Sequence, residues 1–117
     1  MDNYIEILKR EFDAEDGSFL VKLRSDLEWD KEAFSRLASV MQACCEEHEN
    51  VETLERWITE GFWYIPTFVR SWTTHENFPR VHSKEYYEKA YQRLDDLAYW
   101  FFMGESGYLE GKVFEPS

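Results

Sequence analysis

Residues 83–104 read SKEYYEKAYQRLDDLAYWFFMG and hold the longest helical pattern in this sequence of 117 residues. Ser83 can cap a helix start, because its side chain accepts a hydrogen bond from a backbone N–H of the first turn. Gly104 can end the helix, because glycine readily adopts the left-handed conformation found at helix C-termini. The apolar spacing therefore predicts a helix over residues 84–103. Its expected buried stripe comprises Tyr87, Ala90, Tyr91, Leu94, Leu97, Ala98 and Phe101.

The other segments also favour helices. Asp30 and Asn50 are of residue types that cap helix starts. Pro66 suits a first helical turn, and Gly61 can kink or end the helix before it. Residues 19–23, FLVKL, are also compatible with a short strand. The expected additional helices cover residues 4–12, 19–27, 31–48, 51–62 and 66–72.

Five or six short helices with short connections predict an all-α fold, a single compact bundle over residues 1–117. A chain of this length is typical of one domain. The tail after Gly104, ESGYLEGKVFEPS, has no helical period, and its apolar residues indicate that it packs back on the bundle. Those residues are Tyr108, Leu109, Val113 and Phe114.

Acidic side chains dominate the sequence, 24 against 13 basic ones, for a formal net charge of -11. Residues 1–55 hold 15 acidic and 6 basic side chains, a net of -9, and residues 56–117 hold 9 and 7, a net of -2. This balance disfavours direct binding to nucleic acid or to an anionic membrane surface, since Lys and Arg drive both. Two interpretations remain: an acidic surface that keeps the protein soluble, or one that attracts a basic partner.

Three features indicate the cellular location. The start, MDNYIEILKREF, is charged and lacks the apolar core of a signal peptide. No run of about 18 apolar residues, the length that spans a membrane, is present. The two cysteines, Cys44 and Cys45, are adjacent, and neighbouring residues of a helix point in different directions, which disfavours a disulfide between them. We therefore expect a cytoplasmic protein with reduced thiols.

The sequence holds no HExxH, CxxC, EF-hand, GxSxG or phosphate-loop pattern. Cys44, Cys45 and His48 lie close enough on one predicted helix to suggest a metal site or a nucleophile. His75 and His82 could add ligands. The simpler interpretation is two thiols in the core and histidines on the surface. We therefore expect a protein that is not an enzyme and holds no cofactor or metal.

Aromatic residues make up 18% of the sequence, and 14 of the 21 lie between Trp57 and Phe102. The most unusual stretch is residues 56–75, RWITEGFWYIPTFVRSWTTH, which holds six of them. These rings cannot all face one core from short helices. One interpretation packs Trp63 or Tyr64 against the last helix, near Trp100. The other makes them a partly exposed anchor rimmed by Arg70, a composition typical of interface hot spots. The inward set expected around this region comprises Val51, Leu54, Trp57, Ile58 and Phe62.

The last helix carries more rings than its buried stripe needs. Tyr99, Trp100 and Phe102 widen the apolar arc most of the way round the helix. Such a helix either lies at the centre of the bundle or contacts a second copy of the chain.

Two segments resemble a pattern in small bacterial proteins: GFWYIPTFVRSW at 61–72 and YYEKAYQRLDDLAYWFFMGESGY at 86–108. These proteins include immunity proteins that protect cells from their own or neighbouring cells' polymorphic and contact-dependent toxins. The resemblance rests on the aromatic spacing and on the ending WFFMGESGY, and it covers residues 61–108. It implies a small, acidic, cytoplasmic and non-enzymatic protein, and it implies no particular binding residues.

The function expected from these features is binding of a protein partner, with inhibition of a basic toxin or nuclease as the leading case. One alternative is a homo-oligomeric scaffold, such as a homodimer, and another is a small-molecule binder or enzyme that uses Trp63, Trp72 and His75. The expected partner-binding residues are an acidic strip and an aromatic anchor with its rim: Glu46, Glu47, Glu49, Glu52, Glu55, Trp63, Tyr64 and Arg70.

Overall fold

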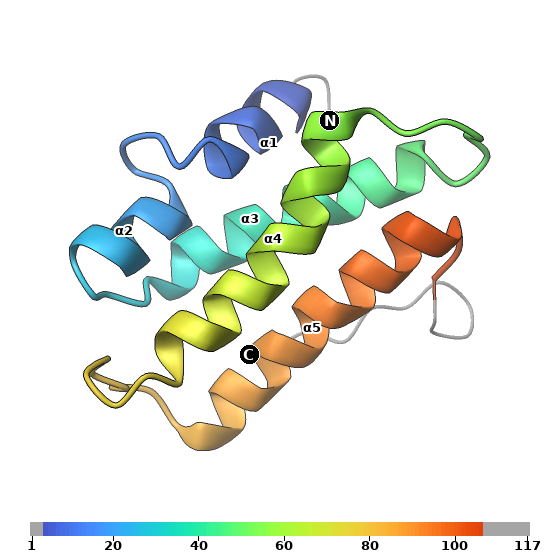
Figure 1. Ribbon diagram of the computed structural model, residues 1–117. Helices are drawn as coiled ribbons and strands as arrows, with labels where there is room; N and C mark the ends of the chain where they lie inside the picture. The colour runs from blue at the N-terminus through green and yellow to red at the C-terminus, as the bar shows by residue number, and fades with distance from the viewer. Residues whose placement is uncertain (1–3, 107–117) are drawn as a thin grey trace.

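A computed structural model of the chain describes residues 4–106, which form five α-helices and no strand (Figure 1). The all-α expectation is therefore confirmed, and the alternative of a strand at 19–23 is wrong. The four apolar tail residues expected to pack on the bundle all lie outside the described residues. The helices are α1 (Tyr4–Phe12), α2 (Phe19–Ser25), α3 (Lys31–Glu47), α4 (Arg56–Thr73) and α5 (Lys84–Met103).

Helix α4 lies across the front of the bundle in Figure 1, with α5 beside it and α3 passing behind. Helices α1 and α2 lie along the other side of α4. Two contacts show that α4 and α5 are antiparallel. The rings of Phe62 and Phe101 stack with centroids 4.2 Å apart, and Arg70 bonds Asp95 at 2.8 Å. The end of α5 therefore lies near the start of α4, where the α3–α4 connection also lies.

Three helix ends that depend on local chemistry are where the sequence predicts them: the starts of α3 and α5 and the end of α5. The Asp30 carboxylate accepts hydrogen bonds from the backbone N–H groups of Glu32 and Ala33 at the start of α3. The Ser83 hydroxyl accepts one from Tyr86 N at the start of α5. Gly104 ends α5 with a φ of 81°, in the left-handed region.

Residues 51–73 differ from the prediction. One helix, α4, replaces the two expected, and it begins at Arg56 rather than after Asn50. Pro66 lies inside it and is buried, so the helix forgoes one backbone hydrogen bond in order to bury a continuous apolar face. Val51 is exposed rather than inward-facing. The Glu49 carboxylate accepts a hydrogen bond from the indole N–H of Trp100 at 2.7 Å. This bond holds the α3–α4 connection against α5, and α4 begins only after that connection.

Gly61 does not end α4. A Cβ at this position would lie 2.2 Å from two ring carbons of Phe12 in α1, closer than any van der Waals contact permits. Glycine is therefore required where α1 crosses α4, whereas the sequence pattern alone predicts that Gly61 kinks or ends the helix.

Gly61→Ala is expected to lower the free energy of unfolding by about 1–3 kcal/mol, because the added methyl group displaces the Phe12 ring from its contacts with Trp57 and Phe62. Urea denaturation measures the loss. The same substitution in a Phe12→Ala background should cost clearly less, since the ring it strikes is gone. Equal costs in both backgrounds would contradict the steric explanation.

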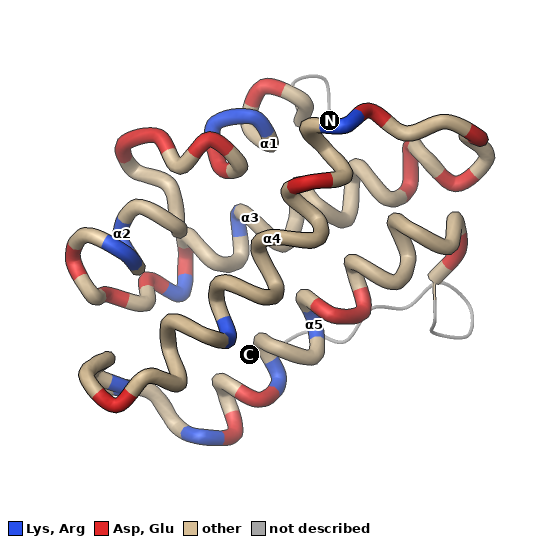
Figure 2. The backbone as a smooth tube through the Cα atoms, in the orientation of Figure 1, with Lys and Arg blue, Asp and Glu red and all other residues tan. Residues whose placement is uncertain are grey.

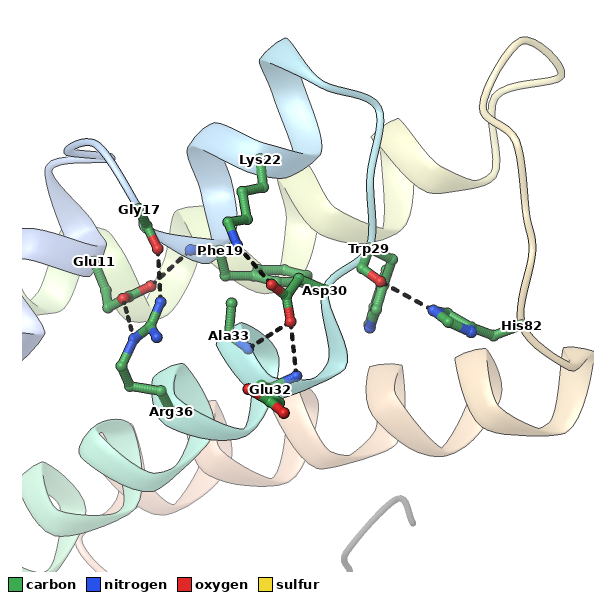
Figure 3. A network of polar contacts seen from close by, with 10 residues as sticks. All are labelled: Glu11, Gly17, Phe19, Lys22, Trp29, Asp30, Glu32, Ala33, Arg36 and His82. Atoms are coloured by element: carbon green, nitrogen blue, oxygen red, sulfur yellow. Dashed lines mark hydrogen bonds and ion pairs between the residues drawn. The ribbon is translucent and has the colours of Figure 1, made fainter.

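A polar network joins α1, the α1–α2 turn and α3 (Figure 3). The buried Glu11 carboxylate accepts hydrogen bonds from Phe19 N at 3.0 Å and from Arg36 Nε at 2.9 Å. Arg36 also donates to the carbonyl oxygen of Gly17 at 2.7 Å. One side chain of α3 thereby ties down both ends of the α1–α2 connection.

A second part of the network joins α2 to the start of α3. Lys22 Nζ lies 2.6 Å from Asp30 Oδ2, while Asp30 Oδ1 caps α3 (Figure 3). The hydrogen bond from Lys22, together with that from Ala33 N, holds the pKa of the Asp30 carboxyl below its usual value. Asp30 therefore stays ionised as both cap and ion-pair partner down to moderately acidic pH.

Candidate functional site

The five glutamates of the expected acidic strip are Glu46, Glu47, Glu49, Glu52 and Glu55. All five are exposed and lie at the C-terminal end of α3 and in the connection to α4. Figure 2 shows acidic positions along this connection at one end of the molecule. Residues 46–60 together hold six carboxylates and one cationic side chain, Arg56, a formal net charge of -5.

Two of these glutamates also have structural partners. Glu49 accepts the indole N–H of Trp100, and Glu55 accepts that of Trp57 at 2.9 Å. Both carboxylates keep exposed surface while these bonds fix their positions. The strip is therefore partly preorganised. Two of its carboxylates are fixed in position by indole N–H groups, which are uncharged and so leave the negative charge of the strip unchanged.

Trp63 is the most exposed aromatic residue among residues 4–106, with 64% of its surface accessible. It is also the one tryptophan whose indole N–H finds no acceptor within these residues. A tryptophan with neither burial nor a hydrogen bond contributes little to folding. The other four donate to oxygens at 2.7 to 3.0 Å, Trp29 to Tyr86, Trp57 to Glu55, Trp72 to Leu23 and Trp100 to Glu49.

The Trp63 ring borders an open hollow of about 550 Å³, which we call the Trp63 hollow. Leu54 lies in the α3–α4 connection between Glu52 and Glu55, so the hollow opens next to the acidic strip. The sequence did not predict this arrangement, since Leu54 was expected in the core and Glu60 had no assigned role. The lining residues are Leu54, Arg56, Thr59, Glu60 and Trp63.

Arg70 lies on the same face of α4 as Trp63, because residues seven apart in a helix share a face. Its guanidinium bonds Asp95 on α5 at 2.8 Å and lies 5.2 Å from the centre of the Tyr91 ring. Phe102, seven residues beyond Asp95, is exposed on the same side of α5. Trp63 thus lies toward α5 without being covered by it, and Phe62 is the ring that stacks on α5.

Tyr64 is 42% exposed and lines not the Trp63 hollow but a separate depression, together with Trp57 and Glu60. It stacks on Phe68, which stacks in turn on Trp72, with centroids 5.3 and 5.5 Å apart. This ladder runs along the side of α4 that faces α1 and α2, where Trp72 donates to Leu23 O. The two expected anchors therefore border different depressions, which share Glu60. Trp63 is the more exposed of the two and borders the hollow that Leu54 also lines.

The structure separates the residues of the small-molecule alternative. Trp72 and His75 border a different depression, of about 500 Å³, at the far end of α4. Trp63 does not line it, and it lies nine residues before Trp72 in the same helix. That second depression is lined by Leu27, Ser71, Trp72, His75, Asn77 and Phe78.

Cys44 and Cys45 are buried, and burial raises the pKa of the Cys44 thiol to about 12. The pKa of Cys45 is raised further, also chiefly by burial. Both remain protonated at neutral pH, and a protonated thiol is a poor nucleophile and metal ligand. Within residues 4–106, no group of three or more His, Cys, Asp or Glu side chains could hold a metal ion.

The exposed apolar residues at the end of α5 are Tyr99, Phe102 and Met103, whereas Trp100 is buried. The helix packs against both α3 and α4. In the part of the chain that the structure describes, none of the helices has the length and apolar character needed to cross a bilayer. Comparison of the chain with protein-family models, with curated proteins and with solved structures finds no match.

Proposed function

We propose that this chain is a binding protein that masks a basic protein partner, as an immunity protein masks a toxin or nuclease. The observation that supports this most is the position of Trp63: an exposed ring without a structural role lies beside a segment with a net charge of -5. Trp is the residue type most typical of interface hot spots, and an acidic rim speeds association with a basic surface.

Binding rather than catalysis accounts for these features. The acidic strip attracts the partner over roughly 10 Å, the screening length at moderate salt. Trp63 then buries its ring against the partner, which slows dissociation. Inhibition follows when the partner's own cationic surface, the part that would meet its substrate, is covered. No step of this scheme needs a nucleophile, a metal or a cofactor.

The test is capture of proteins from an extract of the source organism on the immobilised chain, at about 50 and about 300 mM salt. We expect a basic protein that is retained better at the lower salt. It should be lost when all five strip glutamates are changed to glutamine, which keeps an acceptor oxygen for Trp57 and Trp100. It should also be lost with Trp63→Ala.

A matched control tests whether capture depends on the position of the strip glutamates or only on the net charge of the protein. Neutralising five other exposed acids, Glu15, Asp16, Asp26, Glu28 and Glu32, changes the net charge by the same amount, from -11 to -6. These acids lie in the connections on either side of α2 and at the start of α3, at the opposite end of α3 from Glu46 and Glu47, so capture should persist. Equal loss with both variants, or capture that ignores salt, would contradict the proposal.

Self-association is the second candidate, and the exposed end of α5 favours it. Tyr99, Phe102 and Met103 form an apolar surface that a symmetric dimer could bury. The neighbouring acidic strip opposes it, since two copies would bring like charges together. Light scattering at tens of micromolar decides: a monomer removes this candidate.

A further inference from the structure

We propose that the Trp63 hollow receives an arginine side chain of the partner, stacked on the indole ring and bonded to the Glu60 carboxylate. This inference rests on the proposed function and specifies the chemistry of the same site. Guanidinium is the cation that fits best, because its plane can lie on an aromatic face while its edge donates to a carboxylate. Lysine offers a point charge without that plane.

The fold already contains this arrangement within the chain. Two turns further along the same face of α4, the Arg70 guanidinium lies 5.2 Å from the centre of the Tyr91 ring and donates to Asp95 at 2.8 Å. A ring, a carboxylate and a guanidinium thus meet at the α4–α5 surface. The Trp63 hollow supplies the ring and a carboxylate, and no guanidinium of the described residues, 4–106, is stacked on the ring.

Glu60 is well placed for this role. It lies three residues before Trp63, and residues at that spacing are neighbours on a helix surface. Both line the same hollow. Leu54, in the wall of the hollow, is flanked in the sequence by Glu52 and Glu55 of the acidic strip, neither of which lines the hollow itself.

Arg56 is the cation already in the wall of the hollow. Its guanidinium makes no cation–π contact with Trp63, whereas four other Lys or Arg side chains among residues 4–106 lie over aromatic rings. Arg56 therefore leaves the ring open and opposes an incoming cation by like charge. A second copy of the chain is a poorer occupant, because it would present another acidic surface.

The experiment uses labelled hexa-arginine and hexa-lysine peptides of equal charge, with binding to the full chain followed by fluorescence anisotropy at low salt. Wild type should bind hexa-arginine about three- to tenfold more tightly than hexa-lysine. Trp63→Ala should abolish this preference while leaving weak, salt-sensitive binding of both peptides. Trp63→Phe should retain part of the preference, since it retains a ring.

Variants of the wall test the rest of the proposal. Glu60→Gln should weaken hexa-arginine binding more than hexa-lysine binding, and Arg56→Ala should strengthen both. Tyr99→Ala is the matched control: it removes an exposed ring of α5 that does not line the hollow, and it should change neither affinity. Circular dichroism checks that each variant is folded.

The outcomes separate this inference from the proposed function. Equal affinity for the two peptides, or a preference that survives Trp63→Ala, overturns the arginine site and leaves the acidic binding surface standing. No salt-sensitive binding of either peptide overturns the acidic binding surface and the arginine site together.

Discussion

Arg36→Ala is expected to lower the free energy of unfolding by about 3 kcal/mol or more, because it leaves the buried Glu11 carboxylate without its cation. In the part of the chain that the structure describes, the remaining donor to that carboxylate is Phe19 N, at 3.0 Å. The substitution also frees the Gly17 carbonyl, and with it the α1–α2 turn that the guanidinium holds. Urea denaturation at neutral pH measures the loss.

A double variant shows whether the uncompensated charge is the cause. Arg36→Ala with Glu11→Leu removes the carboxylate as well, and it should recover a substantial part of the stability lost in Arg36→Ala alone. Glu85→Ala is a control on an exposed ion pair, Glu85 with Lys89, and it should cost about 0.5 kcal/mol or less. Similar small costs for Arg36→Ala and Glu85→Ala would show that the Glu11 site is effectively solvated.

The parts of the fold that the sequence predicts well depend on neighbours along the chain. A cap such as Asp30 or Ser83 needs only the next three residues, and Gly104 needs only its own conformation. The limits of α5 follow from these two ends and from its apolar stripe. Local chemistry decides such features, so a single sequence suffices.

The parts that the sequence predicts badly depend on contacts between helices. Gly61 and Pro66 read as breaks because glycine and proline weaken an isolated helix. In the fold, Gly61 admits the Phe12 ring and Pro66 is buried, and packing outweighs both local penalties. Only the position of α1 across α4 explains the glycine, and no spacing in the sequence gives that position.

The candidate site divides in the same way. The acidic strip is contiguous in sequence, so its membership could be predicted, whereas its position at one end of the molecule depends on the fold. The exposure of Trp63 is one of two interpretations that the sequence leaves open, since Trp100 stands in an equally aromatic run and is buried. Glu60 was missed because nothing in the sequence distinguishes it from the other acidic residues. Only its place in the lining of the Trp63 hollow does so.

Trp29 was missed altogether, since it lies between α2 and α3, where no helical period applies. It is 3% exposed, and its carbonyl oxygen accepts a hydrogen bond from His82 Nε2 at 2.9 Å (Figure 3). Its indole donates to the Tyr86 hydroxyl at 3.0 Å. The ring contacts five others with centroids 5.0 to 6.3 Å away, Phe19, Phe34, Tyr86, Tyr87 and Tyr91.

Trp29→Ala is therefore expected to lower the free energy of unfolding by about 3–5 kcal/mol, since it empties the centre of this aromatic cluster. That loss is a large share of the roughly 5–15 kcal/mol that holds a typical domain folded. Trp29→Phe keeps a ring but removes the donor to Tyr86, and it should cost less. Urea denaturation followed by circular dichroism measures both.

Trp63→Ala provides the comparison, because it removes the same side chain from an exposed position. It should change the free energy of unfolding by about 0.5 kcal/mol or less, while it removes the binding proposed above. Trp29 and Trp63 would then have separable roles, one in stability and one in recognition. Equal destabilisation by the two alanine substitutions would contradict this division, because it would mean that the Trp63 ring is also covered in the folded protein.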